Sequence, residues 1–221
     1  TVNGDITGNE DKRDASILPV NFDIVGRDQV EMVGSLIGYE GEIAILSATT
    51  EAPDQNKWIV GMNETLKSDP KYAKMTLVAT VYGDDQPEKS TAEMEALLAN
   101  FPNLKGVIAP TTVGIAAAAQ VVQSRGIADQ VKVTGLGLPS EMRDFVKDGT
   151  VTAFQLWSPY NEGWLAAHFA KGVLEGTIKN EVGGTFEVPN LGTITINANN
   201  MINTQAELTT FNAENIDDFN F

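Results

Sequence analysis

The sequence contains no cysteine and a single histidine, His168, and these absences restrict its chemistry. Without cysteine there is no disulfide and no thiolate nucleophile. A zinc site takes several histidine or cysteine ligands, so we expect no metal and no cofactor. A Ser–His–Asp triad would need His168 to leave a stretch with helical spacing, and no Gly-x-Ser-x-Gly turn is present. The sequence therefore predicts a protein that is not an enzyme.

Basic residues and long apolar runs are also scarce. Lys and Arg number 15 against 30 Asp and Glu, which gives a formal net charge of −15 and a pI of about 4.3. Nucleic acids and anionic membrane surfaces are disfavoured as partners, because both require a basic surface. No stretch approaches the ~18 apolar residues of a membrane span. The opening residues, TVNGDITGNEDKRD, contain no signal peptide.

Apolar, β-branched runs recur along the chain at the spacing of alternating strands and helices. They are EIAILSA (42–48), MTLVATVY (75–82), KGVIAP (105–110), VKVTGLG (131–137) and VTAFQLW (151–157). Segments whose apolar residues have helical spacing lie between them. Alternating strands and helices indicate a parallel sheet with helices on both faces, and continuous apolar runs are typical of strands buried on both faces. The predicted fold class is α/β.

The loops that follow these strands carry polar side chains. In open parallel α/β sheets, ligands bind beyond the carboxyl ends of the strands. Carboxylates and amides accept and donate several hydroxyl hydrogen bonds, and an aromatic ring covers the apolar face of a sugar. A phosphorylated ligand would need a glycine-rich cradle with Lys or Arg, which these loops do not offer. The loops predict a site for a neutral polyol, built from Asp54, Gln55, Thr111, Thr112, Ser140, Gln155, Trp157 and Asn161.

Several of these features also have a purely structural interpretation. Asp54 could cap the helix that begins near it, and Trp157 could be a core residue. The Gly-x-Gly in TGLGLPS resembles a dinucleotide-binding turn, but Pro139 occupies the phosphate-facing position and the third glycine is missing. The neighbouring acids Asp84 and Asp85 are interpreted as solvated charge. Ser158, followed by Pro159, is predicted to cap a helix over residues 158–175.

Four segments together carry a family resemblance. They are GEIAILSATTEAPDQNKWIVGM (41–62), GVIAPTTVGIAAAAQVVQS (106–124), VTGLGLPSEMRDFVKDGTVTAFQLW (133–157) and NIDDFNF (215–221). They resemble the type I periplasmic solute-binding proteins of sugar ABC transporters, in particular the branch that binds rhamnose or autoinducer-2. The resemblance covers essentially the whole chain. It implies two α/β lobes, joined by three crossovers, that close on a sugar.

The resemblance also implies a set of ligand-binding positions. Asp54 and Gln55 match hydroxyl ligands of the C-terminal lobe, and Pro139 matches a position that contributes its backbone. Gln155 matches a polar position of the hinge strand. Thr111 matches a loop residue that lines the cleft, and the carboxylate at the end of TVNGD matches an N-lobe ligand. Trp157, which lies beside Gln155, completes the set. The predicted site is Asp5, Asp54, Gln55, Thr111, Pro139, Gln155 and Trp157.

A whole member of this family would have about the first third of its chain ahead of Thr1. The predicted parts are 1–24, an N-lobe fragment with the first crossover; 25–152, the complete C-terminal lobe; 153–184, an N-lobe helix after the second crossover; and 185–221, the third crossover with a β-rich tail. We expect the partial lobe to expose apolar surface and to be disordered, paired with another copy, or completed by a missing segment.

The predicted function is that of an extracytoplasmic solute-binding component of a carbohydrate ABC transporter. Its partners would be a monosaccharide such as L-rhamnose or another deoxy sugar, and a membrane permease complex. The resemblance places it in the periplasm or lipid-anchored at the cell surface. Three alternatives stay open: an autoinducer-2 receptor of the same fold, the effector domain of a repressor, and a sugar-modifying enzyme of doubly wound fold. Acidity argues against the repressor, and the enzyme would need a catalytic base that the loops do not show.

Overall fold

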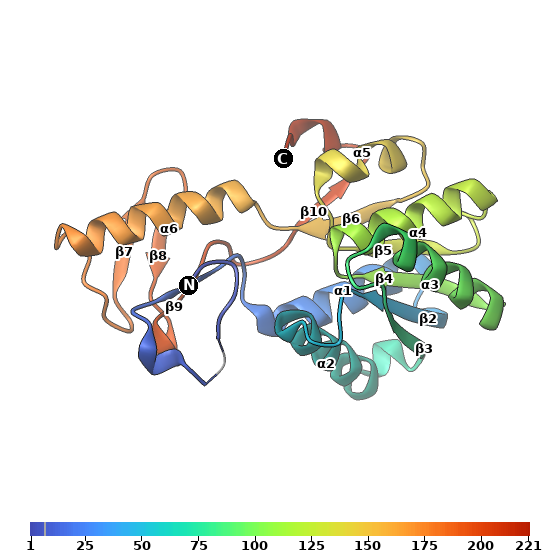
Figure 1. The fold of residues 1–221 in the computed structure, drawn as a ribbon, viewed down its shortest axis with the longest axis horizontal. Coiled ribbons are helices and arrows are strands. Elements are labelled where there is room, and N and C mark those ends of the chain that lie inside the picture. The colour runs from blue at the N-terminus through green and yellow to red at the C-terminus, as the bar shows by residue number, and fades with distance from the viewer. Residues whose placement is uncertain (7) are drawn as a thin grey trace. The chain divides into compact units, whose positions relative to one another are not determined.

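The computed structural model describes residues 1–6 and 8–221, which form two compact units (Figure 1). The first unit combines Thr1–Phe22 with Trp157–Leu208, and the second combines Asp23–Leu156 with Thr209–Phe221. The chain therefore changes unit after residues 22, 156 and 208. The parts predicted from the sequence ended at 24 and 152, and the third crossover was predicted within 185–221.

A pair of strands accounts for the later boundaries. β6 (Ala153–Leu156) pairs antiparallel with β10 (Thr209–Asn212). β6 comes directly before segment 157–208 of the first unit and β10 directly after it, so both strands belong to the second unit. The rings of Phe154 and Phe211 stack with their centroids 5.1 Å apart, which anchors this pairing in the core. The predicted tail 185–221 is thus shared: its earlier strands lie in the first unit and β10 lies in the second.

A four-stranded parallel sheet forms the centre of the second unit. Its strands are β2 (Glu40–Ser47), β3 (Lys74–Tyr82), β4 (Leu104–Ala109) and β5 (Lys132–Gly135), in the order β3-β2-β4-β5. From Ile43 onward every residue of β2 is buried, and β4 is buried except at Lys105. This continuous burial confirms the predicted parallel sheet covered by helices on both faces.

Five helices surround this sheet: α1 (Phe22–Ile37), α2 (Pro53–Ser68), α3 (Pro87–Asn100), α4 (Thr112–Arg125) and α5 (Pro139–Lys147). A short 3-10 turn, η2 (Pro70–Tyr72), leads into β3. α1 and α2 approach closely at Gly26, where an added Cβ would lie 2.5 Å from the carbonyl oxygen of Trp58. Connections between parallel strands are right-handed. A helix therefore covers one face of the sheet when the chain moves to the next strand in one direction along the sheet, and the other face when it moves in the opposite direction.

The first unit is smaller. It contains η1 (Glu10–Lys12), β1 (Ser16–Leu18), α6 (Pro159–Leu174), the hairpin β7 (Thr185–Val188) and β8 (Gly192–Thr195), η3 (Ala198–Asn200) and β9 (Met201–Asn203). β1 and β9 pair in parallel, and a core that includes Ile17, Phe169 and Ile202 joins them to α6. The Oγ of Ser158 accepts a hydrogen bond from the N–H of Asn161, which confirms the predicted N-cap.

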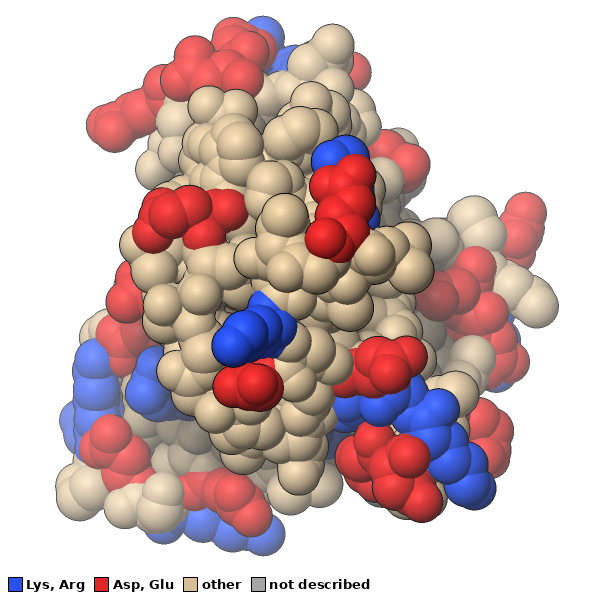
Figure 2. Space-filling view, turned by 90° about the vertical axis from the view of Figure 1, so that its left-hand side faces the viewer, with Lys and Arg blue, Asp and Glu red and all other residues tan. Residues whose placement is uncertain are grey.

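Charged side chains lie in separate groups on the face of the molecule where α6 ends at Leu174 (Figure 2). Figure 2 shows acidic side chains with uncharged surface between them, and most Lys and Arg side chains lie beside acidic ones. In the same unit, Lys171 pairs with Glu175 at 2.6 Å. Across the described residues, none of the helices combines the length and the apolar character needed to cross a membrane.

Candidate functional site

The carboxyl edge of the parallel sheet is where the candidate site residues of the second unit begin. Because β2, β3, β4 and β5 are parallel, the four helices that follow them all start at this edge. The N-cap residues of these helices make no side-chain capping hydrogen bond; they are Ala52, Gln86, Thr111 and Leu138. Helix starts leave backbone N–H groups that side chains, water or a ligand must satisfy. This edge is therefore suited to a polar ligand.

Asp54 lies in the first turn of α2, and it does not cap the helix. The N-cap is Ala52, with Pro53 at the first helical position. Because Pro53 fixes the start of the helix, the capping interpretation of Asp54 is wrong. The carboxylate is half-buried at a helix N-terminus, where the helix dipole stabilises negative charge. The side-chain amide of Asn56 donates to the carbonyl oxygen of Thr50 at 2.8 Å and closes the preceding loop.

Gln55 is held against the end of β2. Its Oε1 accepts a hydrogen bond from the Oγ of Ser47 at 2.7 Å and another from the N–H of Ala48 at 2.9 Å. Ser47 is the last residue of β2 and only 1% exposed. The half-buried Gln55 side chain is thus fixed at its oxygen, while its nitrogen makes no hydrogen bond within the described residues 1–6 and 8–221.

Thr111 is joined to a loop from another strand. Its hydroxyl donates to the carboxylate of Asp85, which lies in the loop after β3. The strand order places β2 between β3 and β4, so this contact connects the loops on either side of β2. The sequence interpretation of Asp84 and Asp85 as solvated charge was incomplete: both are exposed, but Asp84 pairs with Lys89 and Asp85 binds Thr111.

Pro139 and Gln155 lie farther along the second unit. Pro139 is buried at the first position of α5, and the N–H of the next residue donates to the carbonyl oxygen of Phe221 at 3.0 Å. Gln155, in β6, is 8% exposed. Its Oε1 accepts from Nε2 of Gln29 at 2.7 Å, and its Nε2 donates to Oγ1 of Thr210 at 3.4 Å. Both amide atoms of Gln155 therefore have partners inside the unit.

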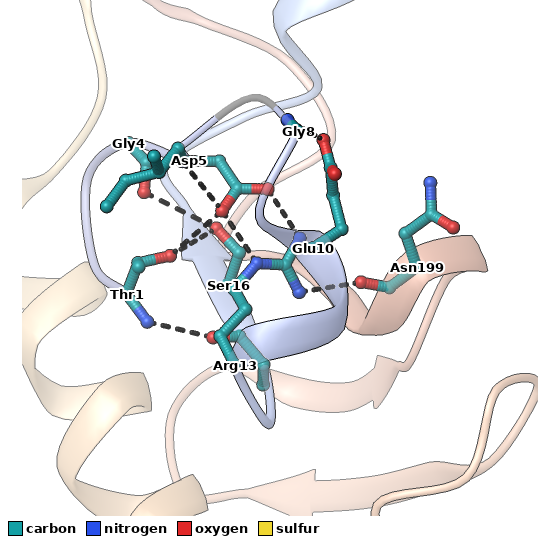
Figure 3. A network of polar contacts seen from close by, with 10 residues as sticks. Thr1, Gly4, Asp5, Gly8, Glu10, Arg13, Ser16 and Asn199 are labelled. Atoms are coloured by element: carbon teal, nitrogen blue, oxygen red, sulfur yellow. Dashed lines mark hydrogen bonds and ion pairs between the residues drawn. The ribbon is translucent and has the colours of Figure 1, made fainter.

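Asp5 belongs to the first unit, where it forms an ion pair with Arg13 (Figure 3). Nε of Arg13 donates to one carboxylate oxygen at 2.6 Å, and its Nη2 donates to the other. The N–H of Ile6 also donates to Asp5, at 3.0 Å. The hydrogen bonds from Arg13 are the main reason that the pKa of Asp5 is lowered. Arg13 further donates to the carbonyl oxygen of Asn199 at 2.7 Å, tying this pair to η3.

Trp157 is half-buried and is the first residue of the first unit after the chain leaves β6. The structure therefore gathers Asp54, Gln55 and Thr111 at one sheet edge, whereas it places Gln155 in an internal network and Asp5 and Trp157 in the other unit. Sequence reasoning missed two polar neighbours, Ser47 and Asp85. Ser47 could have been found as the polar residue that ends the apolar run EIAIL.

The gathered groups can donate and accept hydrogen bonds, which is the chemistry of recognition. Acids, amides and hydroxyls meet there, and the carboxylates of Asp54 and Asp85 are acceptors when ionised. Within the part of the chain that the structure describes, no group of three or more His, Cys, Asp or Glu side chains is arranged to hold a metal ion.

Comparison with known proteins places this arrangement in a family. A family model described as a periplasmic binding protein domain matches residues 1–178. The structure of a sugar ABC transporter protein from Actinomyces odontolyticus matches with 43% sequence identity and a TM-score of 0.91, covering 99% of this chain and 69% of that one.

Two further solved structures contain ligands. An ABC transporter solute-binding protein from Clostridium phytofermentas, with bound L-rhamnose, is 36% identical with a TM-score of 0.83, covering 94% of this chain and 68% of that one. LsrB from Clostridium saccharobutylicum, in complex with AI-2, is 21% identical with a TM-score of 0.85, covering 96% of this chain and 72% of that one. At that identity the likeness to LsrB concerns the fold alone.

Proposed function

The chain belongs to the periplasmic binding protein family, and we propose that it is the extracytoplasmic solute-binding component of a sugar ABC transporter that takes up a deoxy sugar. Members of this family bind a solute and deliver it to a membrane permease. The chain is accordingly a binding protein and not an enzyme, as the absence of a nucleophile and base in its loops predicted.

The observation that carries the ligand proposal is the pair Asp54 and Gln55 at the start of α2. A carboxylate that accepts hydrogen bonds lies next to an amide nitrogen that donates them, at the carboxyl end of a buried parallel strand. Vicinal hydroxyls of a sugar can serve both groups, because each hydroxyl donates and accepts. The relative with bound L-rhamnose is 36% identical to this chain, which favours L-rhamnose or a similar deoxy sugar.

The proposed mechanism is closure of the two units on the sugar. Ligand contacts from both units would favour a closed state, and the permease would recognise that state. Asp54, Gln55 and Thr111 would act for the second unit, with Pro139 and Gln155 supporting the loops and hinge strand. Asp5 would act for the first unit. Trp157 begins the first unit directly after β6, so its fluorescence should report closure.

The proposal extends to a partner for the first unit. An apolar groove of about 450 Å³ runs beside β1 and α6, lined by residues that include Ile17, Phe169 and Val173. Leu174 at the end of α6 is 89% exposed. The relative from A. odontolyticus has nearly a third of its chain outside the match. We therefore assign the groove to a further segment of the same lobe, of the kind that the relatives carry beyond the matched part.

The sugar proposal is tested by isothermal titration calorimetry with L-rhamnose, L-fucose, D-arabinose, D-glucose and autoinducer-2. We expect L-rhamnose to bind most tightly, with quenching or enhancement of fluorescence that Trp157→Phe removes. Asp54→Asn should weaken binding by about 10- to 100-fold, because an unpaired buried polar group costs about 1–3 kcal/mol. Glu51→Gln, which changes an exposed acid in the same loop, is the control and should bind as the unchanged protein does.

The alternatives predict different results. If the protein binds autoinducer-2 but none of the sugars, autoinducer-2 would replace the deoxy sugar as the proposed ligand, and the proposed mechanism would stay the same. Conversion of a sugar to a new product, followed by NMR, would overturn the assignment as a binding protein. A folded protein that binds none of the five compounds would contradict the sugar proposal itself.

A further inference from the structure

We propose that Ser47 and Asp85 are positioning residues that fix the hydrogen-bonding direction of Gln55 and Thr111. Ser47 holds Gln55 so that it offers only N–H donors to a ligand, and Asp85 holds Thr111 so that it offers only acceptor lone pairs. The inference rests on the proposed function and deepens it, because it states which polar groups the sugar must present at each position.

The orientation of the Gln55 amide follows from its neighbours. The oxygen and nitrogen of a glutamine amide are hard to tell apart by shape, so the assignment must come from the hydrogen bonds. A backbone N–H can only donate, and the N–H of Ala48 lies 2.9 Å from the amide atom assigned as Oε1. That atom must therefore be the oxygen. The amide nitrogen is consequently turned away from the end of β2.

Ser47 strengthens this orientation. Its hydroxyl lies 2.7 Å from the same oxygen and is almost completely buried, so it has no water to bind in place of Gln55. Turning the amide over would oppose its NH2 group to the N–H of Ala48 and leave that backbone donor without an acceptor. Two donors thus hold one oxygen, and the two N–H groups of Gln55 remain for a ligand.

Thr111 is fixed in the opposite sense. An ionised carboxylate has only acceptor positions, so the contact with Asp85 uses the single hydroxyl proton of Thr111. Thr111 is the N-cap residue of α4, and such a threonine commonly accepts a hydrogen bond from its own helix, but this side chain makes no capping bond. Its oxygen lone pairs are therefore left for an outside donor.

The site consequently has a defined polarity. Gln55 requires an acceptor on the sugar, while Thr111 and the carboxylate of Asp54 require donors. Replacing a sugar hydroxyl by fluorine removes the donor and keeps only a weak acceptor. A fluorine opposite Gln55 is therefore tolerated, whereas a fluorine opposite Thr111 or Asp54 is not.

The test is calorimetry with L-rhamnose and its monofluorinated deoxy analogues. For the unchanged protein we expect one analogue to bind within about threefold of L-rhamnose and others to bind at least tenfold more weakly. Ser47→Ala removes one of the two donors that hold the Gln55 oxygen and leaves only the N–H of Ala48, so the amide turns more readily and the advantage of the tolerated analogue should shrink below about threefold. Asp85→Asn replaces an acceptor-only carboxylate by an amide that can also donate, so Thr111 is no longer restricted to offering lone pairs and discrimination should fall by a similar factor.

Two controls separate positioning from simple structural damage. Ser47→Thr keeps the hydroxyl and should keep the selectivity pattern, and so should Asp84→Asn, which changes the neighbouring acid that binds Lys89 instead of Thr111. Melting temperatures without sugar monitor folding of every variant. If the unchanged protein binds L-rhamnose but Ser47→Ala and Asp85→Asn retain its selectivity, the inference is overturned and the proposed function stands.

An NMR measurement tests the orientation without any sugar. A through-hydrogen-bond coupling between the Ala48 amide nitrogen and the Gln55 side-chain carbonyl carbon is expected in the free protein. Its absence, with the Ala48 amide well resolved, would contradict the inference. If no sugar binds the unchanged protein, both the proposed function and the role of Ser47 and Asp85 in selection are refuted.

Discussion

Glu162 makes the stability of the first unit depend on pH. This residue lies in the first turn of α6, is 4% exposed, and its Oε1 has no hydrogen-bond partner among the described residues. Burial disfavours the charged carboxylate and raises its pKa to about 7, although the backbone N–H of Asn3 opposes this effect. Near neutral pH the folded protein therefore still holds part of the Glu162 carboxyl in its protonated form.

The size and sign of the effect follow from linkage. Between pH 4.5, the ordinary value, and pH 7, the folded state keeps a proton that the unfolded state releases. The stability associated with Glu162 is therefore complete below pH 4.5 and is lost as the pH rises to 7, by about 1.4 kcal/mol per pH unit. The total loss is about 3 kcal/mol. The pKa of Glu31 is lowered to about 2, so its contribution changes below this window.

Urea unfolding at pH 5 and pH 8 measures this effect. Glu162→Gln keeps the shape and removes the charge, so the variant should gain about 3 kcal/mol relative to the unchanged protein between the two pH values. Glu181→Gln, an exposed acid of the same unit, is the control and should show no such gain. If Glu162→Gln and the unchanged protein lose stability in parallel, the carboxylate is charged without penalty and the reasoning is refuted.

Two further predictions concern packing. Gly135→Ala should destabilise the protein by about 2 kcal/mol or more in thermal unfolding, because its φ is +151° and a Cβ would lie 1.8 Å from the carbonyl oxygen of Ala109. Gly163→Ala is the control, since a Cβ there meets open space. Equal melting temperatures of the two variants would contradict the account. The apolar groove of the first unit should bind the fluorescent probe anilinonaphthalene sulfonate in this chain and lose that binding when the remaining lobe segment is present. A compact monomer that melts cooperatively without binding the probe would show that the groove needs no partner.

The sheet could be predicted from the sequence because burial on both faces leaves a local signature. β2 and β4 have unbroken apolar runs, and those runs give both their position and their parallel pairing. VTAFQLW has the same kind of run, and its Gln155 makes a parallel bridge to Leu136 after β5, yet β6 also pairs antiparallel with β10, more than fifty residues away. The apolar pattern records that a strand is buried but not which strand lies beside it.

The candidate site could likewise be predicted only in part from the sequence. The residue types in the loops indicated a neutral polar ligand, and Asp54, Gln55 and Thr111 do lie at the carboxyl edge of the sheet. Their partners could not be predicted, because Ser47 contacts Gln55 across a loop and Asp85 contacts Thr111 across a strand. Which atom of an amide or hydroxyl remains for a ligand depends on such contacts, and they are properties of the folded chain.

The most direct test of the central claim is a crystal structure of this protein grown with L-rhamnose. The account predicts sugar hydroxyl oxygens within about 2.6–3.2 Å of the Asp54 carboxylate and of Nε2 of Gln55. A bound sugar that contacts neither side chain, with Asp54 turned into bulk solvent, would contradict it.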